Sequence, residues 1–210
     1  MNVLMIGAHP DDIEIGCGGL TLKLAYKGGF KIIWLIMTSG DLIRANKKTR
    51  IEEQRQSCNS MKHVTWDQQF FSDNGLPNEL VPMINLIEKK IKEYEVDMIV
   101  THSAHDTHHD HRAVFQASVE AGRNIDNIIC YEEIVSTVDF KPNLFLNIDQ
   151  LIEDKIKLVA NHRSQCNKTC LNLESIKSLA RHRMAQLNQS IGYCEAYEVY
   201  KLRLGFFLAT

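Results

Sequence analysis

The chain carries several short, wholly apolar runs, and stretches with helical periodicity separate them. The clearest runs are residues 3–6, 32–37 and 98–100. A strand that is covered on both faces has this pattern, whereas a strand with one face in water alternates apolar and polar side chains. Strands and helices alternate along roughly the first 130 residues. The sequence therefore predicts an α/β fold with a mainly parallel sheet and helices on both faces.

The order of the expected elements predicts one domain over residues 1–210. The stretch 79–94 is the clearest amphipathic helix, because its apolar residues recur at helical spacing. Further helices are expected at residues 16–27, 49–62, 110–122 and 173–189, and around residues 152–160. Further strands are expected at residues 64–71, 128–131, 144–148 and 197–204. No repeat or linker divides the chain, so a single domain follows.

The composition excludes several classes of protein. With 210 residues and a formal net charge of -2, the chain has no basic patch that would favour nucleic acid. No apolar stretch approaches the ~20 residues of a membrane helix, and a strand that starts at residue 3 leaves no room for a signal peptide. The six cysteines form no C-x-x-C pair. We therefore expect reduced thiols, a cytoplasmic location, and neither a nucleic-acid nor a membrane partner.

Two polar clusters follow apolar runs directly. Residues 9–14 hold one histidine and three carboxylates, and residues 102–111 hold five of the nine histidines. In open α/β sheets, ligands bind beyond the carboxyl ends of the strands, where both clusters are expected. Two donors from a short loop, His9 and Asp12, with a third from a distant loop, His111, are typical of catalytic zinc, which keeps a position for water. The alternative, that these histidines are structural, must explain both clusters at once.

Two motifs carry a resemblance to a known family. Residues 8–19 have the sequence AHPDDIEIGCGG, and residues 106–111 have the sequence DTHHDH. Together they resemble the zinc-dependent PIG-L/LmbE-like N-deacetylases, and a weaker resemblance extends over most of the chain. The resemblance implies a Rossmann-like fold and removal of the acetyl group from N-acetylglucosamine-type amino sugars. It also implies a homo-oligomer, either a trimer or a hexamer.

Matched residue by residue, the resemblance assigns roles around a zinc ion. It makes His9, Asp12 and His111 the zinc ligands. It makes Asp11 the general base that activates the water on the metal. A carboxylate beside a dication stays ionised, as a base must, so this role is physically consistent.

The second motif supplies the remaining catalytic residues that the resemblance implies. His108 would polarise the substrate carbonyl, stabilise the oxyanion or protonate the leaving amine, and Asp110 would orient it. A positioned oxyanion donor contributes on the order of 3 kcal/mol.

Other polar residues have two interpretations each. Arg50 lies where the family has an arginine that faces the site, so it would contact substrate; alternatively it forms an exposed pair with Glu53. Glu14 would hydrogen-bond the loop of residues 8–12 that carries His9 and Asp12, here called the metal loop, or it would cap the first helix. His162 would line the substrate mouth or lie at a helix end.

Three further features are left open. His109 replaces the proline that is common in the family, and is either an extra ligand or an exposed ring. Glu195 lies in a segment that resembles the family but receives no firm role. His162, Cys166 and Cys170 would share one face of a helix and could hold a second metal, although residues 167–169 resemble a loop.

The sequence thus predicts a zinc-dependent hydrolase that deacetylates a small N-acetylated amino sugar, whether free, nucleotide-linked or conjugated. The alternative is a non-catalytic metal- or sugar-binding protein on the same scaffold. A weaker alternative is a nucleotide-binding protein, because glycines follow the first strand. Those glycines do not match G-x-G-x-x-G, and no acidic residue follows about 20 positions later, as the motif requires.

Overall fold

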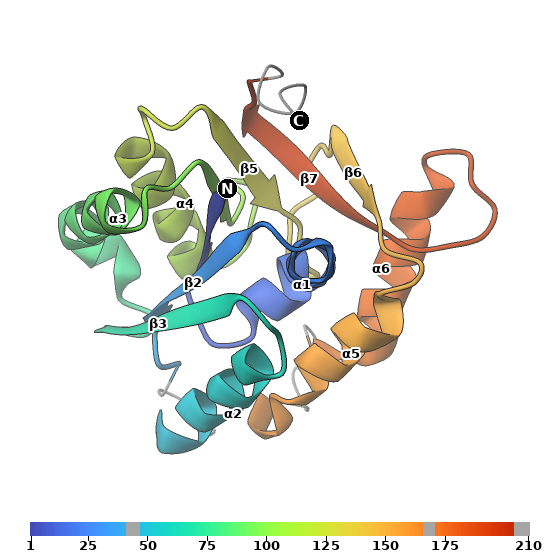
Figure 1. Cartoon of the computed structure of the whole chain (residues 1–210), viewed down its shortest axis with the longest axis horizontal. Coiled ribbons are helices and arrows are strands. Elements are labelled where there is room, and N and C mark those ends of the chain that lie inside the picture. Colours follow the sequence, from blue (N-terminus) through green and yellow to red (C-terminus); the bar gives the residue numbers. More distant parts are fainter. Residues whose placement is uncertain (41–46, 166–170, 204–210) are drawn as a thin grey trace.

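The computed structural model describes residues 1–40, 47–165 and 171–203 (Figure 1). Seven strands of these residues form one sheet in the order β3-β2-β1-β4-β5-β7-β6. The pairs from β3 to β5 are parallel, whereas β7 is antiparallel to both of its neighbours. The strands are β1 Asn2–Gly7, β2 Lys31–Thr38, β3 Val64–Phe71, β4 Met98–Thr101, β5 Asn127–Tyr131, β6 Leu144–Asn147 and β7 Cys194–Lys201.

Helices lie on both faces of this sheet. One face is covered by α3 and α4, the other by α1 and α2, while α6 packs on β7 and α5 packs against α1 and α6 (Figure 1). The helices are α1 Asp12–Lys27, α2 Lys47–Asn59, α3 Leu80–Tyr94, α4 His109–Ala121, α5 Ile152–Ala160 and α6 Leu173–Ala185, with short 3-10 turns η1 Leu76–Glu79 and η2 Arg163–Gln165. The predicted α/β fold with a mainly parallel sheet is confirmed.

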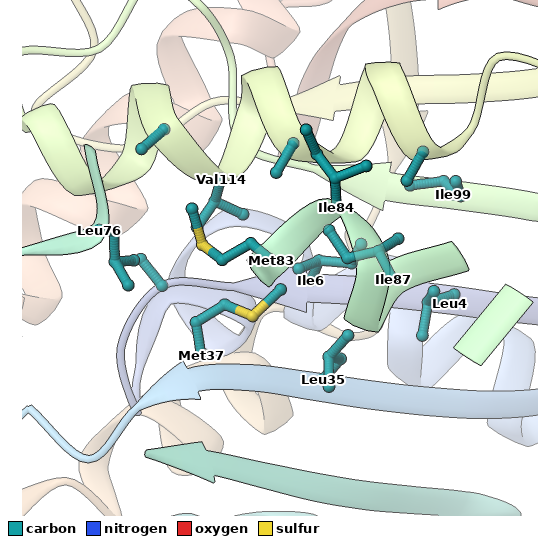
Figure 2. Packing of buried hydrophobic residues seen from close by; sticks show 14 of the residues in the cluster. Leu4, Ile6, Leu35, Met37, Leu76, Met83, Ile84, Ile87, Ile99 and Val114 are labelled. Atoms are coloured by element: carbon teal, nitrogen blue, oxygen red, sulfur yellow. The ribbon is translucent and has the colours of Figure 1, made fainter. Parts of the chain in front are cut away.

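The apolar runs are explained by burial of both faces of each central strand. Along β1, Leu4 and Ile6 point into the cluster beneath α3 and α4, while Val3 and Met5 point into the cluster beneath α1. Figure 2 shows the first cluster, in which Ile87 of α3 lies against the side chains of β1 and β2. Each such buried aliphatic side chain contributes about 1.5 to 3 kcal/mol.

The first helix differs from its prediction. It begins at Asp12 rather than at residue 16, so the glycines lie inside α1 and not before it. A Cβ on Gly16 would lie 2.1 Å from a ring carbon of Tyr131, and one on Gly19 would lie 2.7 Å from Ile148. Close packing of α1 therefore requires these glycines, and they form no phosphate-binding loop. This removes the basis of the nucleotide-binding alternative.

Three other boundaries differ from their predictions. The last strand starts at Cys194 rather than at residue 197, because Cys194 already pairs with Asn147 of β6, and it ends at Lys201. Leu204, its predicted end, lies outside the described residues. Helix α6 ends at Ala185, before Asn188 adopts a left-handed conformation with φ 58°. Helix α2 ends at Asn59, three residues before its predicted end.

Two expectations from composition can be compared with the described residues. Cys17, Cys58, Cys130 and Cys194 are buried free thiols, as predicted, and burial raises the pKa of Cys58 to about 12. In the ranges that the structure describes, every helix is too short or too polar to cross a bilayer.

Candidate metal and catalytic site

The site lies at the carboxyl ends of the parallel strands. The loop from Ala8 to Asp12 follows β1, and residues 102–111 follow β4. Asp73 follows β3, and Glu133 follows β5. Because parallel strands end at the same edge of the sheet, the two predicted clusters meet there.

Two of the predicted ligands, His9 and His111, lie on either side of the third, Asp12, and face different oxygens of its carboxylate. His9 Nδ1 lies 3.5 Å from Asp12 Oδ2, and His111 Nε2 lies 3.6 Å from Asp12 Oδ1. All three side chains are buried. Donor atoms on a tetrahedral ion with bonds of about 2.05 Å lie about 3.3 Å apart. The distances from Asp12 to each imidazole are close to that value, and the donor types are those that a divalent metal ion takes.

Each imidazole of this set has a carboxylate behind it. His9 Nε2 lies 3.2 Å from Asp110 Oδ2 and 3.2 Å from Asp73 Oδ1. His111 Nδ1 lies 3.0 Å from Asp106 Oδ2. A carboxylate behind an imidazole holds the proton on the outer nitrogen and leaves the inner lone pair for a metal. Both rings are therefore oriented as ligands.

Charge in the site favours the ionised forms of Asp12 and Asp110, whereas burial raises the pKa of Glu133 well above its usual value. Burial acts to raise the pKa of Asp12, but His111 and His9 hold it well below its usual value. Burial likewise opposes the ionisation of Asp110, yet its hydrogen bond with His9 lowers its pKa. The site therefore presents buried negative charge to an entering cation.

Arg50 faces the metal loop from α2. Its side chain is only 2% exposed. Nη1 donates to Gly40 O at 2.5 Å, and Nη2 donates to Pro10 O at 2.7 Å and lies 3.3 Å from Asp11 Oδ2. The alternative of an exposed pair with Glu53 is wrong, because Glu53 instead accepts hydrogen bonds from the backbone and hydroxyl of Ser164.

The two adjacent aspartates have different surroundings. Asp12 lies among imidazoles, whereas the carboxylate of Asp11 lies beside the guanidinium of Arg50. Asp11 precedes α1 as its N-cap residue, but its side chain makes no capping hydrogen bond. Its backbone has φ 106°, a conformation that is uncommon for any residue except glycine.

The sequence of the chain matches a known family. The family model described as PIG-L, GlcNAc-PI de-N-acetylase, matches residues 4–122. The chain belongs to the PIG-L family. Over 173 residues it is 34% identical to the uncharacterized deacetylase YaiS of Escherichia coli K12, which covers 77% of this chain and 90% of that protein.

Two more distant PIG-L proteins have named substrates. The diacetylchitobiose deacetylase of Thermococcus kodakarensis is 27% identical over 186 residues, which cover 78% of this chain and 69% of that protein. The solved structure of the N,N'-diacetylchitobiose deacetylase from Pyrococcus horikoshii has a TM-score of 0.79 at 23% identity, covering 99% of this chain and 85% of that chain. The latter likeness shows the shared fold.

His108 and Asp110 interact differently from the family-based expectation. The carboxylate of Asp110 does not orient His108 but lies on His9, and it accepts the backbone N–H groups of Asn74 and Leu76 at 2.7 and 3.1 Å. The backbone N–H of Asp110 donates to His108 Nδ1 at 3.2 Å, where His108 caps α4. Asp110 thus orients His108 through its main chain, because its own side chain is taken by the facing loop.

His108 is held as a neutral ring. Burial, followed by the proximity of His9 and His111, lowers the pKa of His108 to about 4. Since Nδ1 accepts a hydrogen bond, the proton of the neutral ring is on Nε2. That nitrogen can donate a hydrogen bond.

Sequence reasoning missed two buried residues behind Asp12. His102 Nε2 lies 3.1 Å from Asp12 Oδ2, and His102 Nδ1 lies 3.3 Å from Glu133 Oε1. Their ligand atoms form a compact group with those of Asp12 and His111, all within 4.8 Å of one another, and His9, His108 and Asp110 form a second such group. The signal that could have found them is their place just after β4 and β5.

The remaining candidates have structural surroundings. The His109 side chain is 47% exposed and contacts Asn74 O at 3.1 Å, as expected for an exposed ring. His162 lies just beyond α5, as the helix-end interpretation predicts, and pairs with Glu14. Glu14 therefore does not cap α1. Cys166 and Cys170 lie outside the described residues, so the proposed second metal stays a prediction.

Proposed function

We propose that this PIG-L protein is a zinc-dependent hydrolase that removes the acetyl group from an N-acetylated amino sugar. The substrate class is N-acetylglucosamine-type, in free, nucleotide-linked or conjugated form. The named diacetylchitobiose deacetylases among its relatives support a sugar amide. The observation that carries the proposal is the buried His9, Asp12 and His111 set with a second, separately held aspartate next to it.

In this proposal His9, Asp12 and His111 hold the zinc. When bound, zinc supplies a Lewis acid and lowers the pKa of a coordinated water to about 7. The imidazole nitrogens and carboxylate of the set are the ligand types that zinc takes in catalytic sites.

Asp11 is the proposed general base. Its carboxylate is kept apart from the ligand set by Arg50, which contacts both Asp11 Oδ2 and Pro10 O. It accepts a proton from the attacking water and can return that proton to the nitrogen of the leaving amine. Arg50 is also the proposed substrate contact, since its guanidinium lies beside the base.

His108 is the proposed donor to the carbonyl oxygen. Because Nδ1 accepts the N–H of Asp110, the ring presents Nε2–H to the site. Among the roles considered for His108, this tautomer favours polarising the carbonyl and stabilising the oxyanion over protonating the amine. Removing one such donor costs about 3 kcal/mol in the transition state.

A panel of N-acetyl sugars and their nucleotide or glycan conjugates tests the proposal by released acetate with zinc present. Asp11→Asn should lower kcat about 1000-fold while zinc stays bound, because the base is lost and the ligands are not. The matched control is Asp126→Asn, at an exposed aspartate before β5. Normal deacetylation by Asp11→Asn would show that the base is another group.

The non-catalytic alternative makes a different prediction. A metal- or sugar-binding protein would bind zinc but release no acetate from any member of the panel. The trimer or hexamer and the cytoplasmic location stay predictions from the sequence.

A further inference from the structure

The backbone of Asp11 is held in a conformation that costs energy. Its φ and ψ are 106° and -28°, and a non-glycine residue in such a region costs about 1 to 3 kcal/mol. Conformations of this kind persist only where the surrounding structure fixes them. The contacts that fix the Asp11 peptide therefore also fix the direction of its carboxylate.

One of these contacts comes from Gln54, a fully buried residue of α2. Its Oε1 accepts the backbone N–H of Asp11 at 3.3 Å. Its Nε2 donates to Glu14 Oε1 at 2.9 Å. Glu14 can only accept when ionised, so the amide of Gln54 cannot flip without losing both hydrogen bonds.

Glu14 is itself anchored from a third element. Its Oε1 lies 2.8 Å from Nε2 of His162, and both residues are buried. The chain of contacts from His162 through Glu14 and Gln54 thus ends on the peptide of Asp11. It joins the region after α5, helix α1 and helix α2 behind the metal loop.

Gln54 and Arg50 contact different parts of the metal loop at Asp11. Arg50 contacts the Asp11 carboxylate and the carbonyl of Pro10, whereas Gln54 contacts the Asp11 N–H. We propose that Gln54, locked by Glu14 and His162, is a positioning residue that keeps Asp11 left-handed and so aims its carboxylate at the reacting water. This rests on the proposed function in so far as Asp11 is the base.

The first test is Gln54→Met, which keeps the length of the side chain and removes both hydrogen bonds. We expect kcat to fall about 10- to 100-fold, with KM and zinc affinity nearly unchanged, because misplacing a catalytic group by about 1 Å has such an effect. The matched control is Ser57→Ala, at a buried residue one turn further along α2 whose hydroxyl has no hydrogen-bond partner among the described residues. Its kcat should equal that of the wild type.

The second test reverses the hydrogen bonds. Gln54→Glu alone places two carboxylates together and should lower kcat. Combined with Glu14→Gln, the carboxylate at position 54 accepts from Asp11 N–H and from the new amide nitrogen, which takes the place of Glu14 Oε1. The second hydrogen of that amide can be donated to Nε2 of a neutral His162 that carries its proton on Nδ1. The double variant should regain most of the lost kcat, which a purely steric role would not produce.

A crystal structure of Gln54→Met separates this inference from the proposed function. If the wild type releases no acetate, the proposed function fails, and the φ of Asp11 in the variant still tests the role of Gln54. Loss of the left-handed φ supports the inference. An unchanged φ overturns it, as does a wild-type kcat in folded Gln54→Met or a double variant that folds and regains nothing.

Discussion

Two buried carboxylates lie at helix α1, that of Asp12 in its first turn and that of Glu195 from β7. They differ in the groups that surround them. Glu195 lies at the kink of α1, where Cys17 departs from helical geometry and frees backbone N–H groups. Among the described residues, its carboxylate accepts from Gly19 N at 2.7 Å, Leu20 N at 2.9 Å, Lys155 Nζ at 2.6 Å and Tyr197 Oη at 2.6 Å. We call the Glu195 centre closed because protein groups supply the donors and the cation that its carboxylate needs. Its role is therefore structural.

Asp12, in the first turn of the same helix, is surrounded by imidazoles instead. The imidazoles of His9, His102 and His111 lie between it and the carboxylates of Asp106 and Asp110 and the acidic side chain of Glu133. Buried carboxylates that are not balanced by a fixed cation favour binding of one. The structural centre and the candidate metal site thus differ in the groups that surround the buried carboxylate and not in its burial.

The largest effect is expected from a substitution that breaks the closed centre at Glu195. Glu195→Gln leaves the buried Lys155 without its carboxylate and should lower the free energy of unfolding by about 3 to 5 kcal/mol. Zinc affinity of the folded protein should be unchanged. Urea denaturation measures the first quantity and chelator competition the second. Adding Lys155→Met should recover part of the loss; a loss confined to zinc affinity would contradict the division into two centres.

A smaller effect is expected at the centre around Asp12, which is open to a metal ion. Asp106→Asn replaces the carboxylate behind His111 with a neutral amide and should reduce zinc affinity about 10- to 100-fold. Stability of the metal-free protein should fall as well, because His111 lowers the pKa of Asp106 and the fold therefore favours its ionised form. Chelator competition tests this, with Asp126→Asn as the control. Equal zinc affinity in Asp106→Asn and the control would show that Asp106 does not support the ligand.

The smallest effect concerns pH and the pair between the two centres, His162 and Glu14. Burial acts to lower the pKa of His162, but Glu14 raises it above the usual value. The charged pair therefore stabilises the fold below about pH 6.5, and this contribution disappears as pH rises through the raised pKa. His162→Gln should lose about 1 kcal/mol at low pH and less at high pH. Denaturant titrations across the range measure the difference, and a difference independent of pH would contradict it.

Much of the fold follows from local sequence. Wholly apolar runs predict strands buried on both faces, and the periodic stretch before β4 predicts α3 almost to the residue. The two motifs also predict the edge of the sheet at which the site lies. The single domain over residues 1–210 stays a prediction.

Other features depend on which residues are neighbours in space. Nothing in the sequence shows that the carboxylate of Asp110 turns to His9 while its N–H holds His108, because the facing turn at Asn74 comes from another strand. In the sequence, the glycines of α1 resemble a ligand-binding loop. The fold packs the ring of Tyr131 against Gly16, which explains that glycine by close packing.

The sequence by itself determined the layered α/β fold, the family and the pairing of a His-Asp-Asp loop with a histidine-rich loop. Only the tertiary structure decided which carboxylate stands behind which imidazole, and that Glu195 is closed while Asp12 is not. The physical reason is that strand and helix patterns are set by neighbours along the chain. Hydrogen-bond partners and charge balance in a buried site are set by residues that the fold brings together from distant segments.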